Sequence, residues 1–280
     1  MPEGDTIFRA AQTLHRALAG RVVTRFESVF PQLTRVDVDA PLAGRVVELI
    51  ESRGKHLLIW FSGGLVLRTH MRMSGSWHIY RPGERWQRPR HEMRIAIETA
   101  DFVAIGFSVP VAEFATGESL TRTAAVANLG PDPLSNRFDA AEAVRRIRAR
   151  EDIEIGDALL DQSAIAGIGN VYKSEVLFLG GVNPFTRTRD LSSEAISELV
   201  SIATRLMRAN TADGTTAAIA TYAGLRRTTG RADPSARLWV YGRAAKPCRR
   251  CGTPISRAKQ GSHARSTYWC ERCQPGREQR

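Results

Sequence analysis

Apolar side chains recur at helical spacing near the start of the chain. Over residues 5–19 they repeat every three or four positions, which predicts an amphipathic helix. Asp5 or Thr6 is the expected N-terminal cap, and Gly20 is the expected stop. This helix would lay one apolar face on a core.

Short β-rich runs follow the helix as far as about residue 106. The clearest of them cover residues 46–50, 57–61, 65–69, 93–98 and 102–107. Ser62-Gly63-Gly64 has the composition of a hairpin turn between the second and third runs. The Pro- and Arg-rich residues 81–90 indicate an exposed loop. Several short strands in series predict an antiparallel sandwich or barrel.

Gly130-Pro131-Asp132-Pro133 marks the best domain boundary, because Gly and Pro in succession interrupt both kinds of periodicity. Helical patterns follow it over residues 140–149, 171–179, 194–207 and 215–225. The predicted fold class is α+β, with an N-terminal antiparallel β-sandwich and its flanking helix first and a helical domain second. The predicted boundaries are residues 1–130, residues 131–243 and a small C-terminal module over residues 244–280.

The charge balance is strongly basic. The 280 residues include 40 Lys and Arg against 29 Asp and Glu, a formal net charge of +11. Such a surplus favours a polyanionic partner, most simply nucleic acid, although a basic protein with a well-solvated surface has the same composition. Arginine is the main basic residue of the chain, so each lysine needs a specific explanation. The lysines are Lys55, Lys173, Lys246 and Lys259.

No apolar run approaches the length of a membrane span, so we expect a cytosolic protein with no membrane association.

All the cysteines fall in two CxxC pairs near the C-terminus. Cys248 and Cys251 form the first pair, Cys270 and Cys273 the second, and eighteen residues separate the pairs. This spacing is typical of a zinc ribbon, in which two knuckles supply four thiolates to one tetrahedral ion. Two disulfides are the alternative, and they are rare in a reducing cytosol. A module this small buries little core, so we expect one structural Zn²⁺ to supply folding free energy.

The N-terminus carries a second candidate for chemistry. Removal of Met1 leaves Pro2 as a free secondary amine, and an α-amino group titrates near pH 8, so part of it is neutral and nucleophilic at neutral pH. Condensation of this amine with an aldehyde carbon gives an iminium ion, an electron sink of the Schiff-base type. Glu3 beside it can move protons. A second-position proline is also common without any catalytic meaning.

Further motifs occur in order along the chain. They cover residues 53–58, 70–76, 129–134, 165–172, 240–243 and 265–270, with the sequences RGKHLL, HMRMSGS, LGPDPL, IAGIGNVY, VYGR and RSTYWC. Together with the opening MPEGD they resemble the formamidopyrimidine-DNA glycosylase/endonuclease VIII family, and the opening resembles its endonuclease VIII branch. The resemblance implies a helix–two-turn–helix in the helical domain and a zinc-finger β-hairpin at the C-terminus.

The resemblance also implies roles for named residues. Pro2 would attack C1′ of the damaged nucleotide, and Glu3 would protonate the leaving side or the opening sugar ring. Lys55, expected in a strand, would reach a phosphate or donate a proton during elimination, and Arg265 would grip the phosphates flanking the lesion. A solvated strand-edge lysine and a generic surface arginine are the ordinary alternatives.

DNA contacts are implied at further positions. Met73 would be the wedge that fills the gap left by the extruded nucleotide, although a buried strand methionine is the alternative. Glu175 is a candidate second carboxylate or an ordinary helix glutamate. The expected DNA-binding residues are Arg72, Met73, His91, Asn128 and Asn170.

The sequence therefore predicts a bifunctional DNA glycosylase/AP lyase that acts on damaged DNA as a monomer in the bacterial cytosol or nucleoid. It would remove oxidised pyrimidines and nick the strand by β,δ-elimination. Residues 105–114 lack the Arg-x-Phe wedge that the family's guanine-lesion branch usually carries. Two alternatives stay open: an oxidised-purine (8-oxoguanine/formamidopyrimidine) glycosylase of the same family, and a non-catalytic zinc-ribbon DNA-binding protein.

Overall fold

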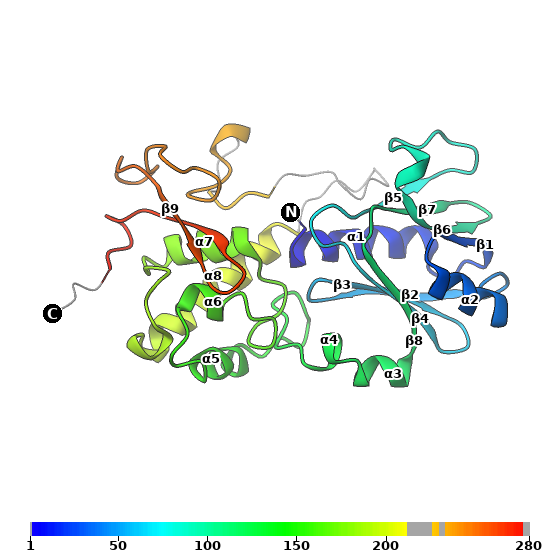
Figure 1. Ribbon diagram of the computed structural model, residues 1–280, viewed down its shortest axis with the longest axis horizontal. Coiled ribbons are helices and arrows are strands. Elements are labelled where there is room, and N and C mark those ends of the chain that lie inside the picture. Colours follow the sequence, from blue (N-terminus) through cyan, green and yellow to red (C-terminus); the bar gives the residue numbers. More distant parts are fainter. Residues whose placement is uncertain (1, 212–225, 230–232, 277–280) are drawn as a thin grey trace. The chain divides into compact units, whose positions relative to one another are not determined.

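The computed structural model describes residues 2–211, 226–229 and 233–276 (Figure 1). The chain divides into two compact units, and the division lies between Asn128 and Leu129. The predicted helix over residues 215–225 lies outside the described residues. No helix in the described part of the chain is long and apolar enough to cross a membrane.

The first unit contains two four-stranded antiparallel sheets, which confirms the predicted sandwich (Figure 1). One sheet has the strand order β1-β6-β7-β5 and the other β2-β3-β4-β8. The first comprises β1 (Val23–Ser28), β6 (Met93–Thr99), β7 (Val103–Phe107) and β5 (Ser76–Tyr80). The second comprises β2 (Val47–Arg53), β3 (His56–Phe61), β4 (Leu65–His70) and β8 (Val111–Thr116).

The predicted first helix is present as α1 (Gly4–Leu18) and packs against β2, β3 and β5. Its N-cap is Glu3, so the predicted cap at Asp5 or Thr6 is wrong. Leu14 and Leu18 are fully buried in the sandwich core. The first residues of the chain are therefore continuous with a helix that is part of the core.

A helix interrupts the region that was predicted to contain only strands. This helix, α2 (Pro31–Asp39), starts with proline in its first turn, where a missing N–H costs nothing. Only Leu33 of its residues is buried, so the apolar pattern that would reveal it is almost absent.

The second unit is helical. The predicted helices over residues 140–149, 171–179 and 194–207 are confirmed as α5, α7 and α8. The first unit ends with the short helices α3 (Gly117–Arg122) and α4 (Ala124–Ala127). The helices of the second unit are α5 (Ala140–Arg148), α6 (Ile155–Ala158), α7 (Asn170–Leu179) and α8 (Ser193–Ala209). Short 3-10 turns are η1 (Arg90–Glu92), η2 (Thr188–Asp190) and η3 (Pro234–Ala236).

The turn between α6 and α7 is braced by one glutamine. The side chain of Gln162 accepts from the amide of Gly167 at 3.0 Å and donates to the carbonyl of Ile168 at 3.0 Å. Gly167 has φ +85°, a conformation that a glycine adopts without strain. A Cβ on Gly130 would lie 2.6 Å from the backbone of Ala164, so the boundary glycine is needed for this close approach.

The C-terminal module is a hairpin of β9 (Ser256–Gln260) and β10 (Arg265–Trp269). It belongs to the second unit. Its Ile255, Cys248 and Cys270 pack in one apolar cluster with Phe178 of α7 and with Val240. The module therefore shares a core with the helices.

Candidate active site

The N-terminal pair lies at the start of α1. Pro2 is partly exposed, while Glu3 is fully buried. The carbonyl of Glu3 accepts from the amides of Thr6 and Ile7 at 2.9 and 3.1 Å, which holds the residue at the helix entrance. The helix dipole favours negative charge at this end. Pro2, whose nitrogen would be a secondary amine after removal of Met1, is thus adjacent to a carboxyl group that is shielded from bulk water.

Lys55 lies in a tight turn and not in a strand, so the expected strand position is wrong. Gly54 and Lys55 form the two-residue connection between β2 and β3, and Arg53 pairs with His56 across it. Gly54 has φ +57°, and glycine is favoured at the first position of such a hairpin turn. The lysine side chain is therefore presented from the tip of a rigid hairpin.

Two histidines next to this hairpin were missed as site residues. His56 and His70 pair across β3 and β4, with ring centroids 4.9 Å apart in an edge-to-face arrangement. A guanidinium nitrogen of Arg68 lies 3.0 Å from Nδ1 of His56. Arginine only donates, so this ring nitrogen must accept. Arg68 is itself bound to Glu113 at 2.6 Å.

Both imidazoles are neutral at physiological pH. Burial, followed by the charge of His70 and of Arg68, lowers the pKa of His56 to about 3. Burial, followed by the charges of Lys55 and Arg72, lowers the pKa of His70 to about 4. The two rings therefore pack beside Lys55 without adding positive charge.

His70 also orders the loop that carries the candidate wedge. Its Nδ1 accepts from the amide of Arg72 at 3.0 Å. Arg72 has φ +44°, which an L-residue rarely adopts without such support. Met73 follows and is 63% exposed, whereas Met71 is fully buried. Met73 is therefore not a buried strand methionine, and its side chain is exposed for contact with a partner.

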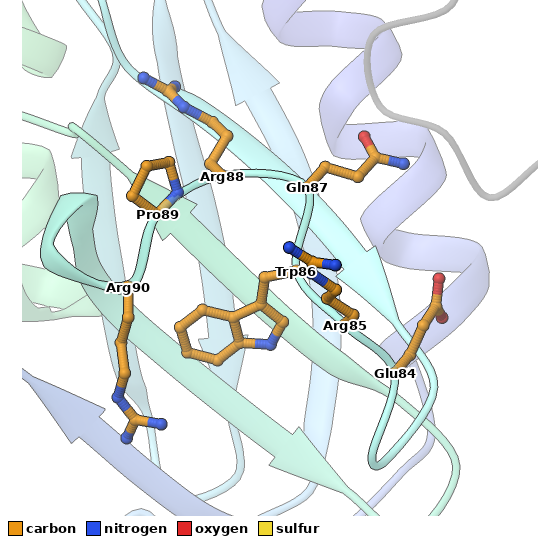
Figure 2. Close-up of a pocket in the computed structure, with 7 residues that line it drawn as sticks. All are labelled: Glu84, Arg85, Trp86, Gln87, Arg88, Pro89 and Arg90. Atoms are coloured by element: carbon orange, nitrogen blue, oxygen red, sulfur yellow. The ribbon is translucent and has the colours of Figure 1, made fainter.

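The loop between β5 and β6 is exposed, as predicted, and residues 84–90 line an open surface depression of about 540 Å³ (Figure 2). Figure 2 shows Arg88 and Arg90 pointing in opposite directions from the loop. Arg88 donates to Ser76 at 2.9 Å, and Arg90 lies over the Trp86 ring at 5.5 Å. The loop is thus a braced basic surface.

Two further predicted contacts lie on the surface of the first unit. His91 belongs to η1, directly after this loop, and is exposed. Asn128 is the C-terminal cap of α4 and is also exposed. Their exposure is compatible with DNA binding, which stays a prediction.

In the second unit two predicted contacts come together. Asn170 begins α7, and its side-chain amide donates to the carbonyl of Ser266 at 2.7 Å. Arg265, the residue before Ser266, is exposed at the start of β10. A helix N-terminus, which binds anions readily, and a guanidinium are therefore neighbours.

Glu175 is fully buried and acts as an anchor within the second unit. Its carboxylate accepts from the amides of Trp239, Val240 and Tyr241 at 2.8, 2.9 and 2.9 Å, and from the hydroxyl of Thr228. These contacts favour a structural role over that of a second catalytic carboxylate, because the oxygens are engaged in holding backbone.

The four cysteines form a site that fits one zinc ion. Their sulfur atoms all lie within 4.8 Å of one another. Cys251 and Cys270 are 3.4 Å apart, and Cys248 and Cys273 are 3.9 Å apart, too far for disulfides. Tetrahedral Zn–S bonds of about 2.3 Å require S–S separations of about 3.8 Å. The ion would be structural, since all four positions are filled by protein.

Profiles of three families match successive parts of the chain. They are the formamidopyrimidine-DNA glycosylase N-terminal domain over residues 1–108, the formamidopyrimidine-DNA glycosylase H2TH domain over residues 129–221, and the zinc finger found in FPG and IleRS over residues 245–276. The chain belongs to the formamidopyrimidine-DNA glycosylase/endonuclease VIII family.

Relatives of known name lie in the endonuclease VIII branch of this family. The chain is 44% identical to the probable endonuclease 8 2 of Streptomyces coelicolor over 279 residues, 99% of this chain and 95% of the relative. It is 38% identical to the DNA-(apurinic or apyrimidinic site) lyase Nei2 of Mycolicibacterium smegmatis over 274 residues, 98% and 99% of the two chains. It is 31% identical to endonuclease 8 of Escherichia coli, over 98% of this chain and all of the relative.

Solved structures of the family share the fold. The complex of Lactococcus lactis Fpg with DNA containing an abasic site matches with a TM-score of 0.80 and 25% identity, over 98% of this chain and all of the other. The wild-type Lactococcus lactis enzyme with DNA containing an oxidised pyrimidine matches with a TM-score of 0.82 and 23% identity, over the same shares.

We predict that the finger of this family member loses its metal when one ligand is changed. Cys270→Ser removes one of four thiolates, so zinc analysis should fall from one ion per chain towards none. The hairpin should lose its order, while the sandwich, which has its own core, stays folded. Ser256→Ala on the same hairpin is the control and should retain one zinc. Zinc-free wild-type protein with an ordered finger would contradict the assignment.

A second prediction concerns acid stability. The pKa of His56 is lowered from 6.5 to about 3 in the folded chain, so the unfolded chain takes up the proton first as the pH falls. The free energy of unfolding should therefore be retained above about pH 6.5 and lost progressively towards pH 3, by at most roughly 1.4 kcal/mol per pH unit for this one group.

His56→Gln should reduce the decrease in the free energy of unfolding between pH 6.5 and pH 4, measured by denaturant titration at several pH values. His91→Gln, at an exposed position, is the matched control and should keep the wild-type slope. Equal slopes in wild type and His56→Gln would show that the buried ring is not the titrating group.

Proposed function

We propose that this protein is a base-excision-repair DNA glycosylase with AP lyase activity that removes oxidised pyrimidines through a covalent Pro2 intermediate. The observation that supports this most directly is the pair Pro2 and Glu3, a partly exposed proline beside a buried carboxyl group at the start of a core helix. Removal of Met1 would make the proline nitrogen a free secondary amine. A damaged base would be extruded from the duplex for attack, as base-removing enzymes require. The protein would act on damaged DNA as a monomer in the bacterial cytosol or nucleoid.

The first step proposed is displacement of the base. Glu3 first takes one proton from the protonated Pro2 amine. The Pro2 nitrogen then forms a bond to C1′ of the damaged nucleotide, the C1′–N glycosidic bond breaks, and the base leaves with the remaining N–H proton of Pro2. The nitrogen lone pair then expels O4′ from C1′, and O4′ takes a proton from Glu3. The product is an iminium ion in which the ring-opened sugar is attached to the protein.

The elimination steps use the iminium as an electron sink. Loss of a proton from C2′ to solvent expels the 3′ phosphate, which is β-elimination. Loss of a second proton, from C4′, to solvent expels the 5′ phosphate, which is δ-elimination. Hydrolysis releases Pro2. Lys55 at the β2–β3 turn and Arg265 on the finger are the proposed cations for these phosphates, since a cation stabilises the departing anion. One N–H of the Asn170 side chain donates to the carbonyl of Ser266, and the other is the proposed additional donor beside Arg265.

Proposed contacts with the duplex lie around the exposed Met73. Insertion of this side chain would fill the gap left by the extruded nucleotide, with Arg72 and His91 on the backbone. Serine, valine and proline form the whole connection between β7 and β8, at residues 108–110, and Val109 is buried. An Arg-x-Phe wedge has no place in so short a turn, which supports the pyrimidine branch.

The covalent nucleophile can be identified by borohydride trapping on DNA with an abasic site. Peptide mapping of the trapped wild-type adduct should place the DNA on Pro2. Lys55→Ala is the matched variant: it removes the other candidate amine and should still give the adduct, with slower strand cleavage. An adduct that maps to Lys55, or one that disappears in Lys55→Ala, would refute the proposed chemistry.

Lesion preference is tested by single-turnover cleavage of matched duplexes that each contain one lesion. Thymine glycol and 5-hydroxyuracil should be cleaved faster than 8-oxoguanine opposite cytosine, because no arginine from the β7–β8 turn reads the opposite base. Fastest cleavage of 8-oxoguanine would overturn the branch assignment and leave the Pro2 chemistry intact.

A further inference from the structure

One lysine of the chain is fully buried and has no part in the chemistry above. Lys173 lies on α7, three residues after Asn170, and its relative exposure is 0%. Its ammonium donates to Oε1 of Gln260 at 3.2 Å and to Oγ1 of Thr267 at 2.5 Å. Buried lysines are rare because desolvation of the charge is costly. This one joins the helix to both strands of the finger hairpin.

The two acceptors lie on either side of Arg265. Gln260, the last residue of β9, is the cross-strand partner of Arg265. Thr267 follows Arg265 by two residues on β10, and Ser266 between them is held by Asn170. Asn170 and Lys173 of α7 therefore contact three hairpin residues around Arg265, namely Ser266, Gln260 and Thr267.

Two partly buried carboxylates around α6 lie next to this cluster. Gln260 donates to Glu154 at 2.8 Å and to the carbonyl of Pro184 at 2.8 Å. Burial raises the pKa of Asp157, while the charge of Lys173 acts in the opposite direction. A Cβ on Gly261 would lie 2.5 Å from the Asp157 carboxylate, so the hairpin tip is pressed against this acid. The ammonium thus has two acceptors, and its charge favours the ionised form of the nearby Asp157.

Zinc cannot supply the same constraint at the tip of the hairpin. The cysteines precede β9 and follow β10, so the metal ties the open end of the hairpin. Arg265 is five residues before Cys270, about 17 Å along an extended strand. A two-stranded ribbon held only at that end would twist and bend. The contacts of Lys173 hold the other end.

We propose that Lys173 is a positioning residue that sets the pose of Arg265 on the DNA phosphates. The inference rests on the proposed function, in which Arg265 binds those phosphates. The ammonium forms directional hydrogen bonds, so it fixes how Gln260 and Thr267 lie against α7. An apolar side chain of equal length would fill the same space without fixing their positions. Lys173 touches no substrate and acts only through the hairpin.

A double-mutant cycle tests this with full-length, zinc-loaded protein and duplex DNA containing a stable abasic-site analogue. Arg265→Ala should weaken binding roughly tenfold, as for loss of a charged hydrogen bond, and reduce the slope of log K against log salt by about 0.9. Lys173→Met should give most of the same loss while retaining one zinc per chain. In the Arg265→Ala background, Lys173→Met should weaken DNA binding by less than about a further twofold, because its effect passes through Arg265.

Lys246→Met is the matched control, since it removes one positive charge from an exposed position of the same module. Any fold-loss in DNA affinity caused by Lys246→Met should multiply with the loss caused by Arg265→Ala. Multiplication of the Lys173→Met and Arg265→Ala effects, with the salt slope of Lys173→Met unchanged, would overturn the inference. If Arg265→Ala itself leaves binding and δ-elimination unchanged, the Arg265 role in the proposed function fails.

A milder variant keeps the test decisive if Lys173→Met does not fold. Thr267→Val is isosteric and removes one acceptor of the ammonium. Like Arg265→Ala, it should lower the ratio of δ- to β-elimination product. In the double variant the two effects should not multiply. An unchanged product ratio in Thr267→Val would count against a role in positioning Arg265.

Discussion

The proposed nucleophile, Pro2, directly precedes a helix of the sandwich core, so its position depends on Glu3 and on α1. The helix supplies that support because Leu14 and Leu18 are buried in the sandwich core. Packing of α1 on β2, β3 and β5 is therefore the constraint on which the proposed chemistry depends.

Buried polar groups give each unit a defined geometry where apolar packing would not. In the first unit, Arg68 links His56 to Glu113, and His70 holds the amide of Arg72. Fully satisfied buried networks rigidify their surroundings, and partly satisfied ones are costly. Desolvation keeps both imidazoles neutral, so the network orders the Met73 loop without repelling Lys55.

The second unit uses the same principle around α7. Glu175 holds three successive backbone amides of the segment that leads into the finger, and Lys173 holds both strands of the hairpin. Phe178 on the same helix contributes to the apolar cluster with Cys248 and Cys270. The metal site, the apolar contacts and the buried charges therefore all hold the same hairpin in place, and that hairpin carries Arg265.

The sequence by itself determined the features that depend on neighbours along the chain. Helical and alternating periodicity identified α1, α5, α7, α8 and most strands of the sandwich, and the CxxC spacing identified the metal ligands. It missed α2, because only Leu33 of that helix is buried, and it misplaced Lys55 in a strand, because Gly54 turns the chain one residue earlier.

Tertiary structure alone decided which polar side chains meet. The partners of Glu175 are 53 to 66 residues away, and those of Lys173 are 87 and 94 residues away. No local pattern encodes such pairs, so a buried anchor and an exposed helix glutamate look alike in the sequence. Burial separates them, because a charge removed from water must find its partners wherever the fold brings them.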